Sequence, residues 1–305
     1  SPLNFIFTNT YGIAPYNTTL TFRYLTGGGV SSNVEAGTLT VLDDTNFTFV
    51  NPNLADTALA NTIFASVSAN NPLAADGGQD GDTVEELRLN AVGNFQNQLR
   101  AVTKEDYLIR TLSMPSNLGT IAKAYAIPTK IADYQPGELP TILDLYVLTY
   151  DADKKLRSAS SLIKRNLRTY LAEYRMINDS IKIKDAFVIN IEVVFDIIVL
   201  PNYNNSEVLT RCIDSLSNYF DIDDWQINQP ILFSDLFVLL DKVEGVQTVK
   251  NIQINNLTGV ALGYSDFAYD IPGATIDGVV YPSIDPMIFE VKFPNSDIKG
   301  RVVPI

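Results

Sequence analysis

Hydrophobic and polar residues alternate along the first part of the chain with the period of a β-strand. Apolar side chains take every second position at Leu20, Phe22 and Tyr24, and the same spacing returns at Leu39 and Val41. Alternation of this kind indicates strands that bury one face. Glycine clusters and an Asn-Pro pair separate the runs, as is typical of turns. The pattern predicts a small β domain over residues 1–80.

The pattern then changes to the period of a helix. Thr83 and Glu86 have the spacing of a capping box, which satisfies backbone N–H groups at the start of a helix. The apolar residues that share one face behind this start are Val84, Leu87, Ala91, Val92, Phe95 and Leu99. A second helix is expected to start at Thr103, with Asp106 at its third position near the positive end of the dipole. We predict linking helices and a loop over residues 81–140.

Strand and helix patterns alternate from residue 142 onward. A strand-like run over residues 142–150 precedes a helical stripe formed by Leu162, Ile163, Leu167, Tyr170, Leu171 and Tyr174. A long strand is then expected over residues 187–199. Its polar residues Asn190, Glu192 and Asp196 fall on the face opposite to its apolar ones, so we expect that face to be at least partly wet.

Two more helices and a strand complete this region. The first helix is marked by Val208, Leu209, Cys212, Ile213, Leu216, Tyr219 and Phe220, and the second by Leu236, Phe237, Leu240 and Val243. Gly245 is expected to end the second helix before a strand over residues 246–254. The order β-α-β-α-α-β predicts a two-layer α/β sandwich over residues 141–255.

The last part of the chain is rich in turn-forming residues. Residues 256–305 contain one clear strand pattern, from Met287 to Phe293, among many Gly, Pro, Asn and Asp residues. We predict a loop-rich C-terminal β extension. Together with the β domain and the sandwich, this extension places the chain in the α+β fold class.

The composition is that of a chain that folds. Apolar residues make up 46 % and charged residues 19 % of the sequence, which are typical values for globular domains. No run reaches the roughly 18 consecutive apolar residues that a membrane helix requires. We therefore predict neither a membrane-spanning segment nor a membrane partner.

The charge balance opposes binding to nucleic acid. The formal net charge is −13, whereas affinity for a phosphate backbone comes mainly from Lys and Arg. The densest basic run comprises Lys154, Lys155, Arg157, Lys164, Arg165 and Arg168. We assign this run to an amphipathic helix, where a solvated polar face is the simpler interpretation. We predict no nucleic-acid partner.

The cysteine and histidine counts exclude much of enzyme chemistry. Cys212 is the only cysteine and histidine is absent. An intrachain disulfide, a cysteine-based zinc site, a histidine metal site and any Ser-His-Asp or Cys-His arrangement are therefore impossible. Cys212 falls on the apolar stripe of its predicted helix, which favours a buried structural thiol.

Three sequence patterns invite a chemical interpretation. The acidic, Gly-rich loop from Asp76 to Asp82 suggests calcium, but the third and twelfth positions counted from Asp76 are Gly78 and Leu87, where an EF-hand needs oxygen ligands. The glycines at 27–29 lack the Lys-Ser/Thr pair and helix start of a phosphate-binding loop.

The third pattern consists of acid pairs that could serve a glycosidase. These are Asp43-Asp44 and Asp223-Asp224. A glycosidase needs two carboxylates that face each other across a cleft, which sequence neighbours rarely do. We predict no catalytic, metal-binding or cofactor-binding residues and no small-molecule substrate.

One segment resembles a known family. From Leu25 to Thr40, the glycines at 27–29 precede Asn33-Val34-Glu35-Ala36-Gly37-Thr38. This run resembles the Gly-rich, Asn-Val-x-Ala-Gly-Thr signature of baseplate J-like proteins from contractile tails. Three further features follow in the family's order, namely Glu85-Glu86-Leu87-Arg88 after the acidic loop, the helix start from Val102 to Tyr107, and the Gly245-Val246 step into a strand. The resemblance covers most of residues 20–255.

The end of the chain narrows this resemblance. The segments from Gly278 to Pro282 and from Asp285 to Asn295 are similar to the C-terminal part of the baseplate wedge protein in T-even-like bacteriophages. The resemblance implies a structural, non-enzymatic component of the wedge. Copies would form an inner ring around the hub, contact neighbouring wedge proteins, and take part in assembly and in the change that triggers sheath contraction.

The resemblance also implies where the protein occurs and what this chain represents. We expect the protein in the virion, at the tail baseplate, after folding in the host cytoplasm. The chain opens at Ser1 within a strand-like run, so we interpret it as the C-terminal part of a longer protein.

Two alternatives stay open. A receptor-binding or glycan-degrading tail protein would share the acidic, Tyr-rich and Asn-rich composition, and would be distinguished by a fibre repeat or by carboxylates paired across a cleft. A baseplate component of a bacterial secretion or injection machine would share the fold. The pattern of the sequence does not separate interface residues from core residues.

Overall fold

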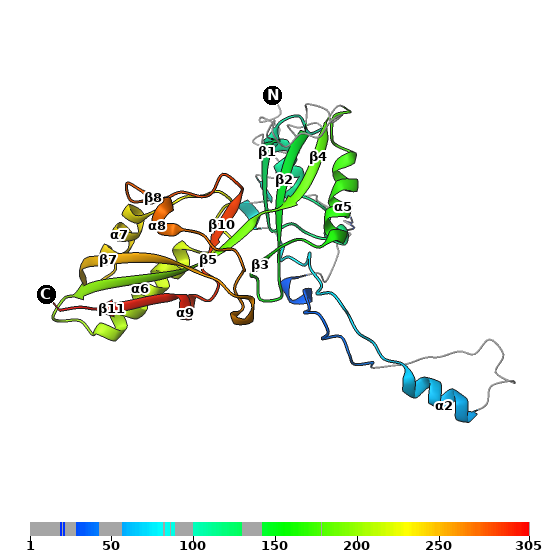
Figure 1. Ribbon diagram of the computed structural model, residues 1–305, viewed down its shortest axis with the longest axis horizontal. Coiled ribbons are helices and arrows are strands. Elements are labelled where there is room, and N and C mark those ends of the chain that lie inside the picture. The colour runs from blue at the N-terminus through cyan, green and yellow to red at the C-terminus, as the bar shows by residue number, and fades with distance from the viewer. Residues whose placement is uncertain are drawn as a thin grey trace.

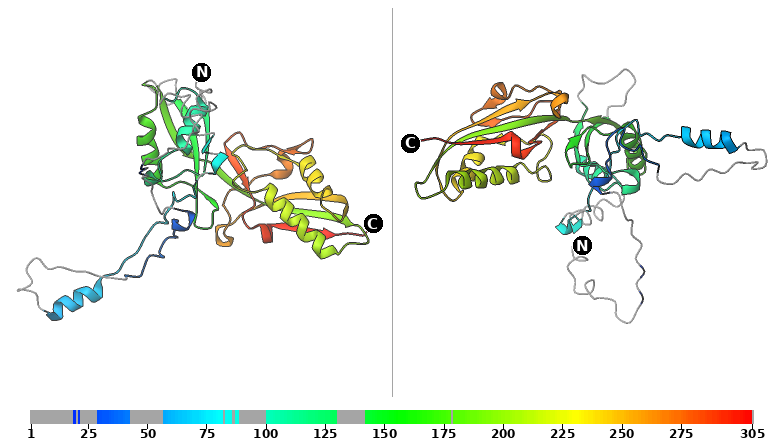
Figure 2. Two further views of the ribbon diagram at one scale, coloured as in Figure 1. Left: turned by 180° about the vertical axis from the view of Figure 1, so that it is seen from behind. Right: turned by 90° about the horizontal axis from the view of Figure 1, so that it is seen from below.

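A computed structural model describes residues 19, 21, 29–42, 57–81, 83–85, 87–88, 100–129, 142–177 and 179–304. Two β-sheets with helices packed on them form the body, and an arm projects from it (Figures 1 and 2). The protein therefore has an α+β fold, as the alternation of strand and helix patterns predicted.

The first sheet is built around one central strand. Its strands are β1 (Lys123–Pro128), β2 (Ile142–Tyr150), β3 (Leu156–Arg157) and β4 (Ser180–Asp185). Strands β1 and β3 pair with β2 antiparallel, whereas β4 pairs with it in parallel. Helices α4 (Lys104–Leu112) and α5 (Ser161–Ala172) belong to this sheet, and the 3-10 turn η3 (Ser116–Leu118) leads from α4 into β1.

Strand β2 is buried on both of its faces. Leu145 and Val147 pack in one cluster with Ile163 and Leu167 of α5. The alternate residues Tyr146, Leu148 and Tyr150 belong to a second cluster, which they share with the other sheet. Side chains alternate across a strand, so a strand buried on both faces joins two cores. The first sheet is thereby packed against the second.

The second sheet surrounds the longest strand. Its members are β5 (Phe187–Val199), β7 (Val246–Leu257), β10 (Met287–Glu290) and β11 (Ile298–Val302). Asn190 of β5 pairs with Leu257 of β7 and with Glu290 of β10, so these two strands lie on opposite edges of β5. Strand β11 pairs with β5 in parallel beside residues that also pair with β7, so it shares the edge of β10.

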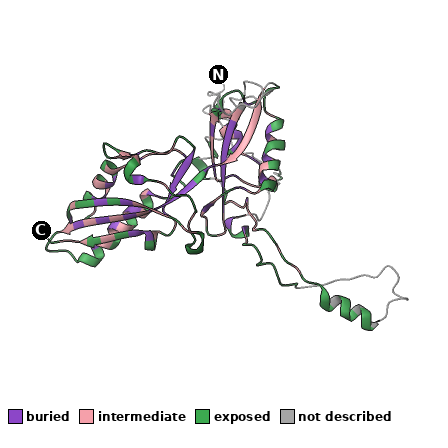
Figure 3. Ribbon diagram, viewed as in Figure 1, coloured by how far each residue is buried: buried purple, intermediate pink, exposed green. Residues whose placement is uncertain are grey.

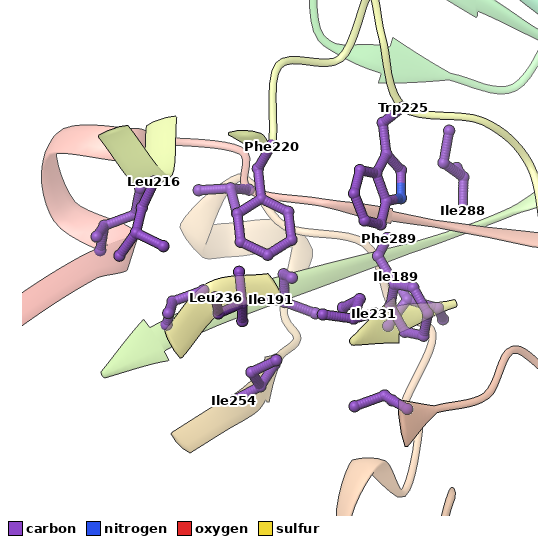
Figure 4. Packing of buried hydrophobic residues seen from close by; sticks show 14 of the residues in the cluster. Ile189, Ile191, Leu216, Phe220, Trp225, Ile231, Leu236, Ile254, Ile288 and Phe289 are labelled. Carbon is purple, nitrogen blue, oxygen red and sulfur yellow. The ribbon is translucent and has the colours of Figure 1, made fainter. Parts of the chain in front are cut away.

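Two helices cover one face of the second sheet. They are α6 (Asn205–Tyr219) and α7 (Phe233–Asp241). Residues Ile191, Val193, Phe195 and Ile197 of β5 face them and are fully or almost fully buried. Figure 4 shows side chains from α6, α7, β5, β7 and β10 meeting in this core. The alternation predicted for residues 187–199 is therefore confirmed for the apolar face.

The remaining elements are short. A small three-stranded sheet joins β6 (Ile231–Leu232), β8 (Thr275–Ile276) and β9 (Val279–Val280). The short helices are α8 (Ile271–Ala274) and α9 (Pro294–Asp297), and the other 3-10 turns are η1 (Val30–Ser32) and η5 (Val260–Leu262). Helix α2 (Thr57–Ser66) lies in the arm.

The helix starts follow the capping signals in the sequence. Thr103 and Asp106 form a complete capping box at α4, which confirms the predicted start. Ser160 caps α5 and Asn204 caps α6 through their side-chain oxygens. Residues 84, 85, 87 and 88 are helical, while the rest of the helix predicted there lies outside the described residues.

Strands were predicted in the first 80 residues, and the described part of this segment shows none. Leu39 and Val41 were expected in strands, but the described residues of this segment contain no strand, and both side chains are exposed. Helix α2 occurs where no helix was predicted. Leu20, Phe22, Tyr24 and the pair Asp43-Asp44 lie outside the described residues. At the described positions Leu39 and Val41, the period of two falls on an extended chain outside any sheet.

The predicted linking region and the predicted sandwich do not correspond to separate units of the fold, because residues of both contribute to the first sheet. Helix α4 packs on β1, and both belong to the first sheet. The two strands predicted over residues 142–150 and 187–199 lie in different sheets. A nearly continuous extended chain, β4 followed by Ala186 and β5, runs from one sheet into the other (Figure 1). A strand pattern does not state which partner the strand will pair with.

Residues 256–305, predicted as an extension, supply two of the four strands of the second sheet. Strand β11 was missed because it is short and contains Gly300. A Cβ at Gly300 would lie 2.4 Å from the ring of Phe195, so this glycine lets β11 approach β5 over a large side chain. Gly300 weakens the strand pattern in the sequence, and the same glycine is required for β11 to pack against β5.

Candidate functional site

Asn33, in the signature segment, is the anchor of the arm. Its side chain is almost completely buried. The Nδ2 group donates to the carbonyl oxygens of Gly78 (2.9 Å) and Tyr150 (3.1 Å), with a longer contact to that of Asp151 (3.3 Å). Its Oδ1 accepts from the N–H of Gly78 at 2.7 Å. One side chain thus connects the start of the arm, the acidic loop and the end of β2.

The acidic loop completes this junction. The Asp76 carboxylate accepts from the N–H of Ser160 at 2.7 Å, next to the start of α5. The carbonyl of Gly77 accepts from both the N–H (2.9 Å) and the Oγ1 hydroxyl (2.6 Å) of Thr120. The loop that suggested calcium in the sequence therefore uses its oxygens to hold backbone groups. Across the part of the chain that the structure describes, no three Asp, Glu, Cys or His side chains come together as metal ligands.

A cleft of ≈ 740 Å3 lies beside this junction. It is bordered by the acidic loop, by β1 and by the turn after α6; its charged lining residues are Asp80, Lys123, Lys154, Asp221, Asp223 and Asp224. Four carboxylates and two ammonium groups leave the lining acidic. Asp223 and Asp224, which form an acid pair in the sequence, line this cleft together with the acidic loop.

Asp223 is held on several sides within the cleft. Its carboxylate accepts from the Tyr150 hydroxyl at 3.1 Å and from the Lys154 ammonium at 2.6 Å. Its backbone carbonyl accepts from the buried Lys123 ammonium at 2.7 Å. The bond to Asp223 raises the pKa of Lys154, and burial together with the Asp223 charge raises the pKa of Tyr150. These contacts fasten the turn after α6 to the first sheet.

The arm consists of two extended segments and a helix, and we use the name for residues 34–42, 57–66 and 67–75. The N–H of Ala75 donates to the carbonyl of Val34, and the N–H of Gly37 to that of Asn71, both at 2.8 Å. The Asn71 side chain adds bonds to Leu39 N–H and Glu35 carbonyl. These bonds hold the segments side by side, and α2 lies beyond them, clear of the body in both views of Figure 2.

Most described residues of the arm are exposed, as the green ribbon of Figure 3 shows, and several of them are apolar. Val41 is 86 % exposed, Leu73 77 % and Leu59 of α2 59 %. Ile63, one turn further along α2, is also exposed. Exposed apolar residues gathered on one segment, as opposed to single ones scattered over a surface, are typical of interaction surfaces. Leu39 and Val41 were predicted in strands of a β domain, and both are exposed on the arm.

The structure also shows where the cysteine, the glycine cluster and the basic run named in the sequence lie. Cys212 is fully buried in α6, and burial raises its pKa to about 11, as expected for a structural thiol. Of the glycines at 27–29, only Gly29 is described, and it precedes the turn η1. In the basic run, Lys154 pairs with Asp223 and Lys164 with Asp185, while Arg165 and Arg168 are exposed on α5.

A buried polar connection between the sheets was missed. Asn190, expected on a wet face, is buried, and it donates to Glu290 at 2.8 Å. The other Glu290 oxygen accepts from the N–H of Leu156 in β3 at 2.9 Å. Burial raises the pKa of Glu290. No local signal singled out this pair, because Asn190 is one of three polar residues in its strand pattern and Glu290 is one of two in its own.

Comparisons with known proteins were made by sequence and by structure. A scan against protein-family models finds no match, and a search of the curated proteins finds none either. Among solved structures, the chain is similar to one in the cryo-EM structure of the anti-feeding prophage (AFP) baseplate, with a TM-score of 0.44 and 14 % sequence identity. The match covers 82 % of this chain and 51 % of the other, so the chain spans about half the length of that neighbour. Among the described helices, none has the length and apolar character needed to cross a membrane.

Proposed function

We propose that this chain is a structural component of a contractile-tail baseplate and performs no catalysis. The observation that carries the proposal is the position of the signature segment. Its residues resemble those of baseplate J-like proteins, and its asparagine, Asn33, is the buried joint from which the arm projects. A signature used to anchor an interaction arm suits a protein whose work is assembly.

The arm supports this role on physical grounds. Helix α2 has ten residues and exposed apolar side chains. A helix of this length is marginally stable in water by itself, and most helices draw their stability from packing an apolar face. A partner protein that covers Leu59 and Ile63 would stabilise α2 and gain hydrophobic contact area. The cleft is also more consistent with a structural role, because Asp223 is bound to Tyr150 and Lys154.

The finer proposal follows the resemblance of the C-terminal segments. We propose that the chain corresponds to the part of the baseplate wedge protein called gene product six in T-even-like phages. Copies would join in the inner ring around the hub, contact neighbouring wedge proteins, and take part in the change that triggers sheath contraction. The protein would reside in the virion, at the tail baseplate, with no nucleic-acid, membrane or small-molecule partner.

Immunogold electron microscopy tests the proposal. Antibody raised against this chain is applied to intact tailed particles from cells that express it, before and after mild opening of the tail. We expect label confined to the baseplate. Pre-immune serum and antibody absorbed with the purified chain are the controls.

The alternatives give different patterns of label. Label at fibre tips, together with release of reducing sugar from bacterial surface glycans above a heat-killed control, would favour a receptor-binding or glycan-degrading protein. Absence of label from every particle, with the antibody still detecting the chain in lysate, would contradict a virion location.

A further inference from the structure

We infer that Arg110 of helix α4 binds a carboxylate side chain of a partner protein. The inference rests on the proposed function, which requires partners, and it names the chemical group that one partner supplies. Two nitrogens of the Arg110 guanidinium are buried and have no hydrogen-bond acceptor among the described residues. A buried charge of this kind is unfavourable until it is paired.

Helix α4 directs Arg110 into the interior of the protein. Its buried residues are Tyr107, Arg110 and Thr111, and their spacing of three and four positions puts them on one face of the helix. Helix α4 contacts β1 and α5, so this face meets them. Because only 4 % of the Arg110 surface is exposed, the fold holds a permanently charged guanidinium below its surface.

One flat side of the guanidinium is covered by an aromatic ring. The Cζ atom of Arg110 lies 4.5 Å from the centroid of the ring of Tyr174, which follows the end of α5. The negative face of such a ring attracts a cation. This contact satisfies the flat side of the guanidinium, but it accepts no hydrogen bond from the N–H groups that lie in the guanidinium plane. The edge of the group therefore stays unpaired.

The unpaired edge has the geometry that recognises a carboxylate. It consists of Nε and Nη2, whose N–H groups point in the same direction and match the two oxygens of a carboxylate. The protein already contains one such pair, in which Nε and Nη2 of Arg301 donate to the two carboxylate oxygens of Asp196 at 3.0 and 2.9 Å. Arg110 offers the same edge with no acceptor in the described part of the chain.

Two carboxylates close to α4 have other partners. Asp106, one turn before Arg110, accepts from two backbone N–H groups at the start of the helix, each at 2.9 Å. Asp179 accepts from the hydroxyl of Tyr107 at 2.6 Å. A bidentate pair uses both oxygens of a carboxylate, so pairing either residue with Arg110 would compete with these bonds. A carboxylate from another protein would satisfy Arg110 and leave them intact.

A partner protein fits this site better than a free ion does. A free carboxylate loses translational freedom on binding, and a single ion pair does little to offset that loss. A carboxylate on a partner is held in place by the rest of the interface, where buried arginines often dominate the binding energy. The site also lies near the surface, because Tyr174 is half-buried and Leu112 is 46 % exposed. Since Nε and Nη2 are covered in the free chain, binding includes a small displacement of the side chains around them.

Side-chain NMR of the full chain with isotope-labelled arginine tests the site. The probe is N-acetylglutamate amide, a capped residue with one carboxylate, and its uncharged control is N-acetylglutamine amide. Arg110→Met identifies the Nε–H signal of Arg110, and Arg168→Met, on the exposed side of α5, is the control variant. Arg110→Lys keeps the positive charge but not the two parallel donors, and it replaces Arg110→Met if that variant does not fold. Circular dichroism checks the folding of each variant.

The glutamate probe, and not the glutamine probe, should shift the Nε–H signal of Arg110. We expect half-saturation above about 10 mM, because one ion pair supplies the affinity. Relative to the glutamine probe, it should also raise the melting temperature of the unaltered chain and of Arg168→Met, but not that of either Arg110 variant. Equal shifts from the two probes would overturn the inference. Saturation by sodium acetate below about 1 mM would assign the site to a free small carboxylate, and so would overturn the partner.

Incorporation into particles tests the partner itself. By immunogold labelling, we expect Arg110→Met to enter baseplates at least about 5-fold less than Arg168→Met, because loss of one member of a buried charged pair weakens an interface strongly. Equal incorporation of the two variants would overturn the inference and leave the proposed function standing. If the unaltered chain were absent from baseplates while the glutamate probe still bound Arg110, the proposed function would fail and the carboxylate site would remain.

Discussion

Asn190 on β5 donates a hydrogen bond to Glu290 on β10, and both side chains are almost completely buried. The second oxygen of Glu290 accepts from Leu156 in β3, which belongs to the first sheet. One carboxyl group therefore connects strands of both sheets at the place where they meet. A buried polar group with both oxygens used holds a specific geometry that apolar packing alone leaves less defined.

Removal of this carboxyl should destabilise the protein. Glu290→Ala leaves the N–H of Leu156 and the amide of Asn190 buried without an acceptor, at about 1–3 kcal/mol for each orphaned group. We expect the free energy of unfolding in urea to fall by about 2–4 kcal/mol at neutral pH. Glu207→Ala, which removes an exposed carboxylate paired with Arg211 on α6, is the control and should change it by less than about 1 kcal/mol.

The same residue should make stability depend on pH. Burial raises the pKa of Glu290, so the native protein binds this proton more tightly than the unfolded chain does. The stability that this raised pKa contributes is fully present below the pKa of about 4.3 that a glutamate has in the unfolded chain. It is lost as pH rises through the higher pKa of the folded state. Relative to Glu290→Gln, the unaltered protein should lose stability as pH rises from 4 to 8. A difference that stays constant with pH would contradict the raised pKa.

Asp196 should respond to pH in the opposite direction. The Arg301 guanidinium, with Nε and NH2 at 3.0 and 2.9 Å from the two carboxylate oxygens, lowers the pKa of Asp196. Stability from this pair is present above the ordinary aspartate pKa of about 3.9 and is lost as pH falls through the lower folded value. In Arg301→Gln, an NMR titration should find the pKa of Asp196 shifted upward, while Lys242→Gln should leave it unchanged.

Asn33 should control the anchorage of the arm. Asn33→Asp keeps the size of the side chain but points a carboxylate oxygen at the carbonyls of Gly78 and Tyr150, where Nδ2 donates. We expect faster hydrogen exchange over residues 34–42 and 67–81 and a loss of about 1–3 kcal/mol in unfolding free energy. Asn61→Asp, on exposed α2, is the matched control. Equal exchange in both variants would argue against the anchor.

Gly300 should tolerate no side chain. A Cβ there would lie 2.4 Å from Phe195 Cζ and 2.8 Å from Leu209 Cδ2, so Gly300→Ala forces the core between β11 and α6 to shift. We expect a loss of about 1–3 kcal/mol in thermal or urea unfolding. Gly81→Ala, where a Cβ meets nothing within 4 Å, should be near neutral. Comparable losses for the two would contradict this packing.

Much of the local structure could be predicted from the sequence. The helix start at Thr103 and the apolar face of β5 are local features, since capping and periodicity involve residues a few positions apart. The α+β class follows from the same patterns. The absence of histidine and the single cysteine restrict the available chemistry through composition alone.

Strand partners and the candidate site depended on the tertiary structure. The parallel pairing of β5 with β10 joins residues 100 positions apart, as does the bond from Asn190 to Glu290. Only the fold placed Asn33 against the end of β2, and only the fold left Leu59 and Ile63 uncovered. The sequence does not distinguish an apolar residue that packs in the core from one that stays exposed on the surface, because the hydrophobic effect is non-directional. Periodicity determined which residues share a face, and the three-dimensional arrangement decided what each face meets.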